Sequence, residues 1–195
     1  LSLFDGMSCG QIALNNLGVE VDNYFASEID KYAIKIAKKN FPDMIHVGDV
    51  TQVKANAFDT QIDLVMGGSP CQGFSRAGKH LNFDDPRSKL FFEFVRLVKE
   101  LRPKYFLLEN VKMTKEHRDT ISDVLGVEPI YIDSALVSAQ TRKRYYWTNI
   151  PYIFGPINQH IILKDIIQTE GELEGSVVDE RMVTNKGKAY CLTAR

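Results

Sequence analysis

The sequence predicts an α/β domain with a doubly wound, mainly parallel sheet, and three observations lead to this prediction. Short apolar runs alternate with segments of helical spacing from Leu1 to Asn110, which is typical of successive β-α-β units. Glycines occupy the first expected strand-to-helix turn, at Gly6 and Gly10. The chain has 195 residues, which is enough for one domain with a substantial core.

The elements follow one another in a regular order along this part of the chain. Apolar runs predict the strands, and apolar residues spaced three or four apart predict the helices between them. The predicted strands cover residues 1–4, 24–26, 45–47, 63–66 and 105–108, and the predicted helices cover 11–17, 31–40 and 88–101. Gly18 and Pro42 end the first two helices. In the second helix we expect four side chains to face the core: Tyr32, Ile34, Ile36 and Ala37.

Polar residues stand directly after five of these strands. In a parallel sheet the carboxyl ends of the strands meet along one rim, and ligands bind there. We therefore expect a single composite site at this rim, formed by Asp5, Glu28, Asp49, Cys71 and Glu109.

The pattern changes in the second half of the chain. Residues 112–126 are predicted to be helical, 130–133 and 144–148 are predicted strands, and 140–144 form a basic connector. From Pro151 onward the periodicity weakens, and residues 168–188 are rich in Glu, Gly and Lys. We therefore predict a main domain over residues 1–150 and a short, less regular region over 151–195.

The composition is that of an ordinary globular protein, with 44% hydrophobic and 25% charged residues. No apolar run approaches the ~20 residues that a membrane-spanning helix needs, and no signal peptide is visible. Cys9, Cys71 and Cys191 lack the spacing of a zinc site or a disulfide framework. We expect an intracellular protein without metal or membrane association, in the cytoplasm or nucleoid, or in the nucleus if eukaryotic. The formal charge of −1 argues neither for nor against nucleic-acid binding, because a local basic patch is enough to contact phosphates.

The first turn and the next two strand ends predict a pocket for an adenosine-type ligand. Glycines in the turn from Phe4 to Gly10 let the backbone approach a ligand closely. Glu28 follows about 20 residues later, where a carboxylate is placed to bind ribose hydroxyls. Asp49 is placed to accept from an adenine amino group, with Ile29 and Val50 as apolar walls. Helix capping is the alternative role for either carboxylate, and the pocket alone does not separate a nicotinamide cofactor from S-adenosylmethionine.

A second glycine-containing loop, residues 67–73, follows the fourth predicted strand and carries a cysteine. Pro70 fixes one backbone angle, and the glycines permit a sharp turn that presents a thiol above the sheet. Free cysteines are more often small buried hydrophobes, and this is the role we expect for Cys9 and Cys191. Cys71 is instead the predicted nucleophile.

Five segments, taken in order, resemble the DNA cytosine-5 methyltransferase family. Gly-Ser-Pro-Cys-Gln at 68–72 resembles the nucleophile loop of that family. The other segments resemble its cofactor turn, its ribose and adenine carboxylates, its Glu-Asn-Val motif and its Gln-x-Arg-x-Arg motif: Phe4-Asp5-Gly6, Glu28 with Asp49, Glu109-Asn110-Val111 and Gln140-Thr141-Arg142-Lys143-Arg144. The match covers residues 1 to about 150. The Phe-Asp-Gly start, Ala26-Ser27-Glu28 and residues 146–151 resemble the eukaryotic de novo branch and phage-like relatives more than the commonest bacterial restriction-linked enzymes.

The resemblance implies a Rossmann-like S-adenosylmethionine-dependent methyltransferase fold. It implies a catalytic, cofactor-binding domain over residues 1–150 and a short target-recognition region over 151–195. The cofactor would be S-adenosylmethionine, released as S-adenosylhomocysteine, and the partner would be double-stranded DNA. The residues expected around the cofactor are Phe4, Asp5, Gly6, Glu28, Ile29, Asp49, Val50, Pro70 and Leu90.

The resemblance also assigns catalytic roles. Carbon 5 of cytosine is a poor nucleophile, so a thiolate, here that of Cys71, must first add to carbon 6. Glu109 would serve the ring nitrogen N3 as charge develops there. Arg144 would hold the base carbonyl, and Arg142 would support it or the DNA backbone. The base must leave the duplex for this chemistry, so base flipping is expected.

The family's later helix motif and its Gly-Asn-rich closing motif are absent, which leaves open whether the chain is a fragment and whether it is active. Three alternatives stay open. The same chemistry could act on transfer RNA, the chain could be a non-catalytic regulatory homologue, or the pocket could serve a nicotinamide-dependent oxidoreductase. The oligomeric state and the DNA target sequence are not predicted.

Overall fold

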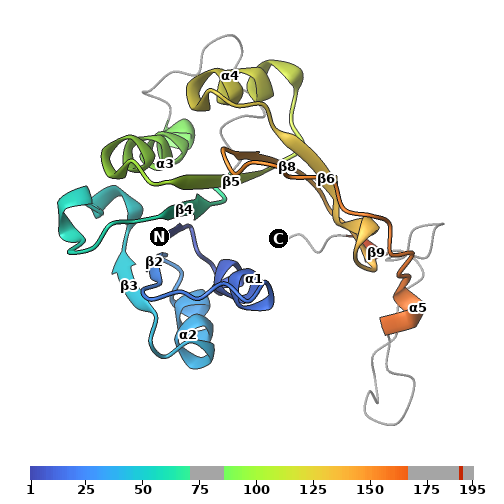
Figure 1. Cartoon of the computed structure of the whole chain (residues 1–195), viewed down its shortest axis with the longest axis horizontal. Coiled ribbons are helices and arrows are strands. Elements are labelled where there is room, and N and C mark those ends of the chain that lie inside the picture. Colours follow the sequence, from blue (N-terminus) through green and yellow to red (C-terminus); the bar gives the residue numbers. More distant parts are fainter. Residues whose placement is uncertain (71–85, 167–188, 191–195) are drawn as a thin grey trace. The chain divides into compact units, whose positions relative to one another are not determined.

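The computed structural model describes residues 1–70, 86–166 and 189–190 (Figure 1). The chain divides into two compact units. The first consists of Leu1–Pro129 with Tyr146–Pro151, and the second of Ile130–Tyr145 with Tyr152–Arg195.

A mainly parallel sheet forms the centre of the first unit. Its strands are β1 (Ser2–Leu3), β2 (Phe25–Ser27), β3 (Ile45–Gly48), β4 (Leu64–Gly67) and β5 (Tyr105–Val111). β8 (Lys143–Thr148) continues the sheet beyond β5, and β6 (Ile130–Asp133), from the second unit, pairs with β8. The order is β3-β2-β1-β4-β5-β8-β6, and the pairs β1–β2, β2–β3, β1–β4 and β4–β5 are all parallel. The predicted doubly wound α/β fold is therefore confirmed.

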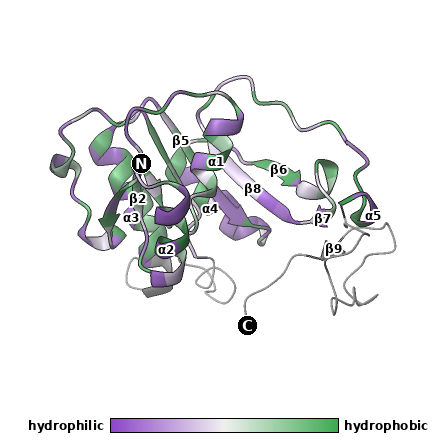
Figure 2. Cartoon of the chain, turned by 90° about the horizontal axis from the view of Figure 1, so that it is seen from below, coloured by the Kyte–Doolittle hydropathy of each residue, from purple (hydrophilic) through white to green (hydrophobic). Residues whose placement is uncertain are grey.

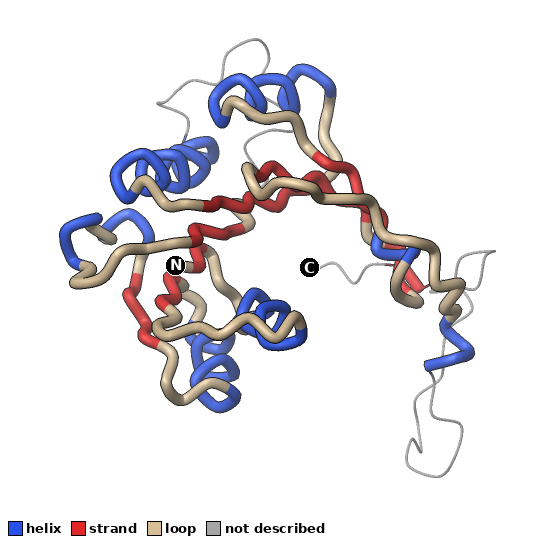
Figure 3. The backbone as a smooth tube through the Cα atoms, viewed as in Figure 1, coloured by secondary structure: helices blue, strands red, loops and turns tan. Residues whose placement is uncertain are grey.

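Helices of the first unit flank this sheet. They are α1 (Cys9–Asn16), α2 (Lys31–Asn40), α3 (Pro86–Leu101) and α4 (Lys115–Leu125), with short 3-10 turns η1 (Val50–Gln52) and η2 (Ala55–Ala57). Figure 3 shows α1 and α2 on one side of the strands, with α3 and α4 on the other. Among the residues that the structure describes, no helix is long and apolar enough to cross a membrane.

The predicted limits of α2 agree with the structure, but two of its four core residues were wrongly predicted. Ala37 is 1% exposed, whereas Tyr32 is 67% and Ile36 43% exposed. Asp30 starts the helix by accepting hydrogen bonds from the amides of Tyr32 and Ala33, both at 2.8 Å. The small Ala37 packs with Tyr24, Ala26, Met44 and Met66, so the helix approaches the sheet on its alanine side. The prediction was right for Ala37, and it was wrong for Tyr32 and Ile36, which lie on the exposed side of the helix.

Two strand predictions also need correction. β5 extends to Val111, so Glu109 and Asn110 lie inside the strand and not after it. Burial alternates along β5, with Phe106, Leu108 and Asn110 on the covered face and Glu109 on the other. The expected basic connector contains a strand, β7 (Gln140–Thr141), which pairs in parallel with β9 (Ala189–Tyr190).

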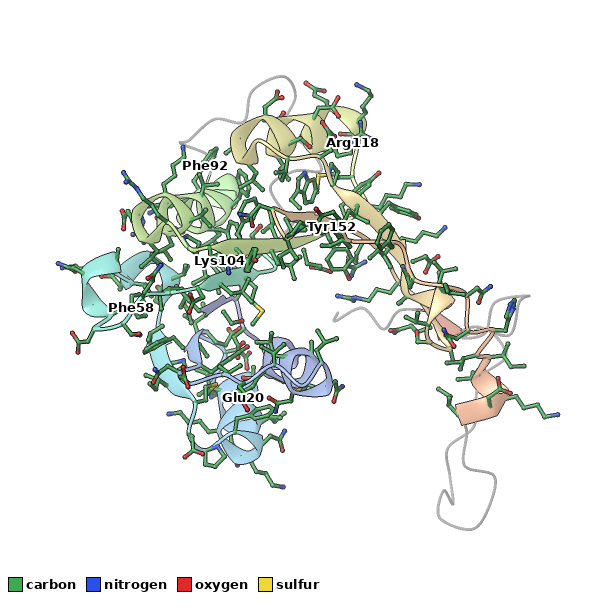
Figure 4. The ribbon with its side chains drawn as sticks, in the orientation of Figure 1. Glu20, Phe58, Phe92, Lys104, Arg118 and Tyr152 are labelled. Carbon is green, nitrogen blue, oxygen red and sulfur yellow. The ribbon has the colours of Figure 1, made fainter. Side chains whose placement is uncertain are left out.

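Polar side chains anchor the end of β8 within the first unit. Trp147 is fully buried and donates from Nε1 to the hydroxyl of Ser122 on α4, at 3.0 Å. Asn149 accepts from the amide of Phe106 at 2.8 Å and donates to the carbonyl of Lys104 at 3.0 Å. Figure 4 labels Lys104 at the start of β5 and Arg118 on α4. These contacts fix the edge of the sheet beside β5.

The second unit has η4 (Ser134–Leu136) and α5 (Leu163–Ile166) besides β6, β7 and β9. In Figure 2 β6 is largely green, whereas β8 is white to purple. This difference follows from the sequences, because β6 is Ile-Tyr-Ile-Asp and β8 begins with Lys143 and Arg144.

Arg96 on α3 fastens the segment that follows β3. Its guanidinium donates to the carbonyls of Val50, at 3.3 Å, and Val53, at 2.9 Å. It also pairs with Glu93 at 2.7 Å and Glu100 at 2.9 Å, which are one turn away on the same helix. One planar side chain thus satisfies two loop carbonyls and two carboxylates.

We predict that Arg96→Lys lowers the melting temperature by several degrees. A lysine cannot reach all four acceptors, and the lost hydrogen bonds contribute about 1 to 2 kcal/mol in total, at about 2 to 4 °C per kcal/mol for a chain of this size. Differential scanning calorimetry measures the shift. Arg102→Lys, at an exposed position, is the matched control. Equal melting temperatures for the two variants would show that the anchor is unimportant.

Candidate active site and cofactor pocket

The strand order reverses between β1 and β4, which are neighbours in the sheet. Leu3 pairs with Gly67, so the loops after these two strands leave the sheet side by side. A Cβ on Gly67 would lie 2.7 Å from the carbonyl oxygen of Leu3, so only glycine fits there. The crevice at such a reversal is where doubly wound folds bind their ligands.

The loop after β1 has an unusual backbone. Phe4, Gly6 and Ser8 have φ values of 56°, 61° and 63°, which is uncommon for residues other than glycine. Nothing lies within 4 Å of the position that a Cβ on Gly6 would take, so the backbone is open to a ligand there. The predicted glycine turn is therefore present and accessible at Gly6.

The carboxylate of Asp5 points into the protein and not toward the opening at Gly6. Asp5 is 9% exposed, and it accepts hydrogen bonds from the hydroxyls of Tyr24, at 2.7 Å, and Ser8, at 2.5 Å. Its predicted contact with a cofactor can therefore come only from its backbone.

Glu28, at the end of β2, joins the same loop. One carboxylate oxygen accepts from the amide of Gly6 at 2.8 Å, and the other accepts from the amides of Ile29, at 2.8 Å, and Asp30, at 2.9 Å. A carboxylate has about four lone-pair sites, so capacity for a further donor remains. Its half-buried position next to Gly6 suits a ribose ligand.

The strand end after β3 carries Asp49, which is exposed and accepts from the amide of Thr51 at 2.9 Å. The capping role considered for Asp49 is thus observed, and it occupies one oxygen. The two expected apolar walls differ, because Ile29 is 74% exposed whereas Val50 is 5% exposed and packs in the core.

The second loop brings Gly68 against Glu109. A Cβ on Gly68 would lie 3.0 Å from Oε2 of Glu109, so this carboxylate rests against the segment that leads to Cys71. Cys71 lies outside the described residues. Pro70 is the last described residue before it and is exposed. Leu90 on α3 is half-buried.

Asn110, to which the sequence analysis gave no separate role, holds this loop. It is 2% exposed, and its Nδ2 lies 3.3 Å from both the carbonyl and the hydroxyl oxygen of Ser69. Its Oδ1 accepts from the amide of Val111 at 2.8 Å. The sequence signal for this role was an amide side chain at a buried position of a strand, because a buried polar group needs a hydrogen-bond partner.

The two predicted arginines belong to the second unit. Arg142 is exposed, its amide donates to Asp133 at 3.1 Å, and its carbonyl accepts from the amide of Ser134. Arg144 is half-buried and donates from Nη1 to the carbonyl of Lys143 at 2.9 Å. Their catalytic roles stay predictions.

Comparison with known proteins shows which family this chain resembles. The sequence profile of the C-5 cytosine-specific DNA methylase family matches residues 1–126. The type II methyltransferase M1.ScrFI of Lactococcus lactis subsp. cremoris is 42% identical over 157 residues, which is 75% of this chain and 40% of that protein. The orphan methyltransferase M.Rho11sI of Bacillus phage rho11s is 44% identical over 119 residues, 60% of this chain and 24% of that protein. The chain therefore spans less than half the length of these relatives.

Solved structures show the same fold. A prophage-encoded Escherichia coli protein described as a DNA modification methyltransferase superposes with a TM-score of 0.62 at 32% identity, covering 75% of this chain and 44% of that one. DNMT2 of Spodoptera frugiperda superposes with a TM-score of 0.62 at 25% identity, covering 94% of this chain and 61% of that one. These neighbours confirm the Rossmann-like fold of S-adenosylmethionine-dependent methyltransferases. Since the profile also covers well over half of the residues, this chain belongs to the C-5 cytosine-specific DNA methylase family.

Proposed function

We propose that this protein transfers a methyl group from S-adenosylmethionine to carbon 5 of a cytosine flipped out of double-stranded DNA, through a transient covalent bond to Cys71. The observation that carries the proposal is the contact between Glu109 and Gly68, because it joins a carboxyl group to the loop of the predicted nucleophile. The neighbouring strand end carries the glycine turn with Glu28, so cofactor and base would meet at one crevice.

The residues present fit the cofactor. Glu28 retains acceptor capacity for a ribose hydroxyl, the backbone at Gly6 is open, and the exposed carboxylate of Asp49 suits an adenine amino group. Phe4, Pro70 and Leu90 would complete the surroundings. When bound, S-adenosylmethionine supplies an electrophilic methyl group.

The thiolate of Cys71 would add to carbon 6 of the base and push an electron pair onto carbon 5. That pair would form the bond to the methyl carbon while the bond from this carbon to the sulfonium sulfur breaks, and S-adenosylhomocysteine would be the leaving group. The hydrogen on carbon 5 then leaves as a proton, its bonding electrons re-form the double bond, and the thiolate is expelled. Cys71 is thus regenerated in every cycle.

Glu109 would hold a proton at the ring nitrogen N3 while negative charge develops there. Its position on the less covered face of β5 supports this role, since the carboxyl group adjoins the loop of Cys71 and not the packed core. Arg144 would bind the base carbonyl through its planar fork, and Arg142 would support it or a phosphate.

Two alternatives in the same family are methylation of transfer RNA and a non-catalytic regulatory role. DNA methylation is favoured over both by the identities to phage and bacterial methyltransferases, by the Pro-Cys-Gln sequence of the loop and by the intact pair Cys71 and Glu109. Parallel assays on duplex DNA and on transfer RNA separate the first alternative. A non-catalytic homologue would methylate neither. A reduced thiol and a DNA substrate also imply an intracellular setting.

We predict that a duplex containing 5-fluorocytosine forms a covalent adduct with this protein in the presence of S-adenosylmethionine. Fluorine cannot leave as a cation, so the thiolate is not expelled and mass spectrometry detects the conjugate. Cys71→Ser should give none, because a serine hydroxyl supplies almost no alkoxide near neutral pH. Cys9→Ser, at an exposed cysteine, is the matched control and should react normally. An adduct in the Cys71→Ser variant would exclude Cys71 as the nucleophile.

We predict that Gly68→Ala slows single-turnover methylation about tenfold or more, while DNA affinity and melting temperature change little. The added methyl group would lie 3.0 Å from Oε2 of Glu109, so the carboxylate must shift by a few tenths of an ångström, and catalytic rates are sensitive to such shifts. Gly155→Ala is the control, since nothing lies within 4 Å of a Cβ there. Unchanged turnover in Gly68→Ala would argue against a catalytic role for Glu109.

We predict that Glu28→Gln weakens S-adenosylmethionine binding at least tenfold without altering DNA affinity. The amide removes a charge-assisted acceptor contributing about 1.5 to 3 kcal/mol, and its NH₂ group would face a backbone amide. Isothermal titration calorimetry measures the change, with Glu116→Gln on the surface of α4 as control. Equal cofactor affinities for the two variants would place the ribose elsewhere.

A further inference from the structure

The loop of residues 4 to 8 has a conformation that its own sequence does not favour. Two of its three residues with positive φ, Phe4 and Ser8, are not glycine. Each such residue costs on the order of 1 to 3 kcal/mol, and the conformation persists only where surrounding contacts enforce it. The contacts that enforce it here are therefore part of the cofactor site.

These contacts centre on the carboxylate of Asp5. Tyr24, just before β2, donates to Oδ1 at 2.7 Å, and Ser8 donates to Oδ2 at 2.5 Å. The backbone adds two hydrogen bonds, from the amide of Asp5 to the carbonyl of Ser27, at 3.1 Å, and from the amide of Ser8 to the carbonyl of Asp5, at 3.2 Å. The Tyr24 and Ser8 hydroxyls thus hold Asp5 from both sides.

Tyr24 is suited to act as a permanent donor. It is 5% exposed and packs with Ala26, Ala37, Met44 and Met66. Burial raises the pKa of its phenol well above the usual range, so the hydroxyl keeps its proton at any physiological pH. A phenylalanine would fill the same volume, and only the hydroxyl distinguishes tyrosine at this position.

We infer that Tyr24 is a positioning residue for the cofactor, acting through Asp5 on the backbone of Gly6. Asp5 and Gly6 are consecutive, and they are held in two directions, Asp5 by Tyr24 and the amide of Gly6 by Glu28 at 2.8 Å. Without the hydroxyl, the carboxylate of Asp5 keeps only one of the two hydroxyls that hold it, that of Ser8, and the strained loop relaxes by rotation about the Asp5–Gly6 peptide. The amide then leaves Glu28, and the ribose acceptor loses its orientation. This inference rests on the proposed cofactor site.

The test is Tyr24→Phe, with Tyr32→Phe at an exposed tyrosine of α2 as the matched control. Calorimetry with S-adenosylhomocysteine should show an affinity about tenfold lower in Tyr24→Phe, which corresponds to one lost buried hydrogen bond. The KM for S-adenosylmethionine should rise by a similar factor with kcat and DNA affinity nearly unchanged. A lower melting temperature with unchanged cofactor affinity would overturn the inference, since that is the mark of a purely structural tyrosine.

Hydrogen exchange followed by mass spectrometry tests the loop without any ligand. The amides of residues 5 to 8 should exchange faster in Tyr24→Phe than in wild type, and equal rates would overturn the inference even if the protein bound no S-adenosylhomocysteine. Such a lack of binding would count instead against the proposed function. Ser8→Ala removes the other hydroxyl and should have the same two effects, which keeps the inference testable if Tyr24→Phe does not fold. The double variant should lose little more affinity than the worse single one, because both hydroxyls act through Asp5.

Discussion

The pairing of β1 with β4 is the constraint on which the rest of the first unit depends. Two parallel strands whose connections run in opposite directions leave a crevice at their carboxyl ends. Leu3 and Gly67 lie in register there, and their backbones are too close for a side chain on Gly67. The loop after β1 and the loop after β4 therefore begin as neighbours. Under the proposed function, short loops are then enough to bring an adenosine pocket and the thiol of Cys71 to one crevice.

Buried polar side chains hold both loops through hydrogen bonds. Asp5 is fixed by two hydroxyls, and Ser69 is fixed by the amide of Asn110. Hydrogen bonds specify direction as well as proximity, whereas hydrophobic contacts are non-directional. The proposed site requires the backbone of Gly6 and the carboxyl group beside Gly68 to be placed within a few tenths of an ångström. Such placement needs this directional control.

The sequence was sufficient for the mainly parallel sheet with its helices, because this fold follows from the alternation of strands and helices along the chain. It failed where a long-range partner decides. The side of α2 that faces the sheet depends on how closely Ala37 packs against it. The short strand β7 depends on its pairing with β9. Glu109 and Asn110 have the polar sequence of a strand end, and only the neighbouring strand and loop show that they continue β5. The roles of Tyr24, Asn110 and Arg96 were invisible for the same reason, since each depends on a partner between 19 and 46 residues away.

The carboxyl groups of Glu28 and Glu109 illustrate how one residue type can have two different surroundings. Glu28 accepts hydrogen bonds from three backbone amides, which hold its carboxylate in one orientation. Glu109 rests against Gly68, where a missing side chain leaves its carboxyl group room beside the nucleophile loop. Under the proposed function, Glu109 would exchange a proton with the base and would use this room, whereas Glu28 would serve as a fixed acceptor for the ribose. The backbone around each carboxyl group thus suits it to a different proposed role.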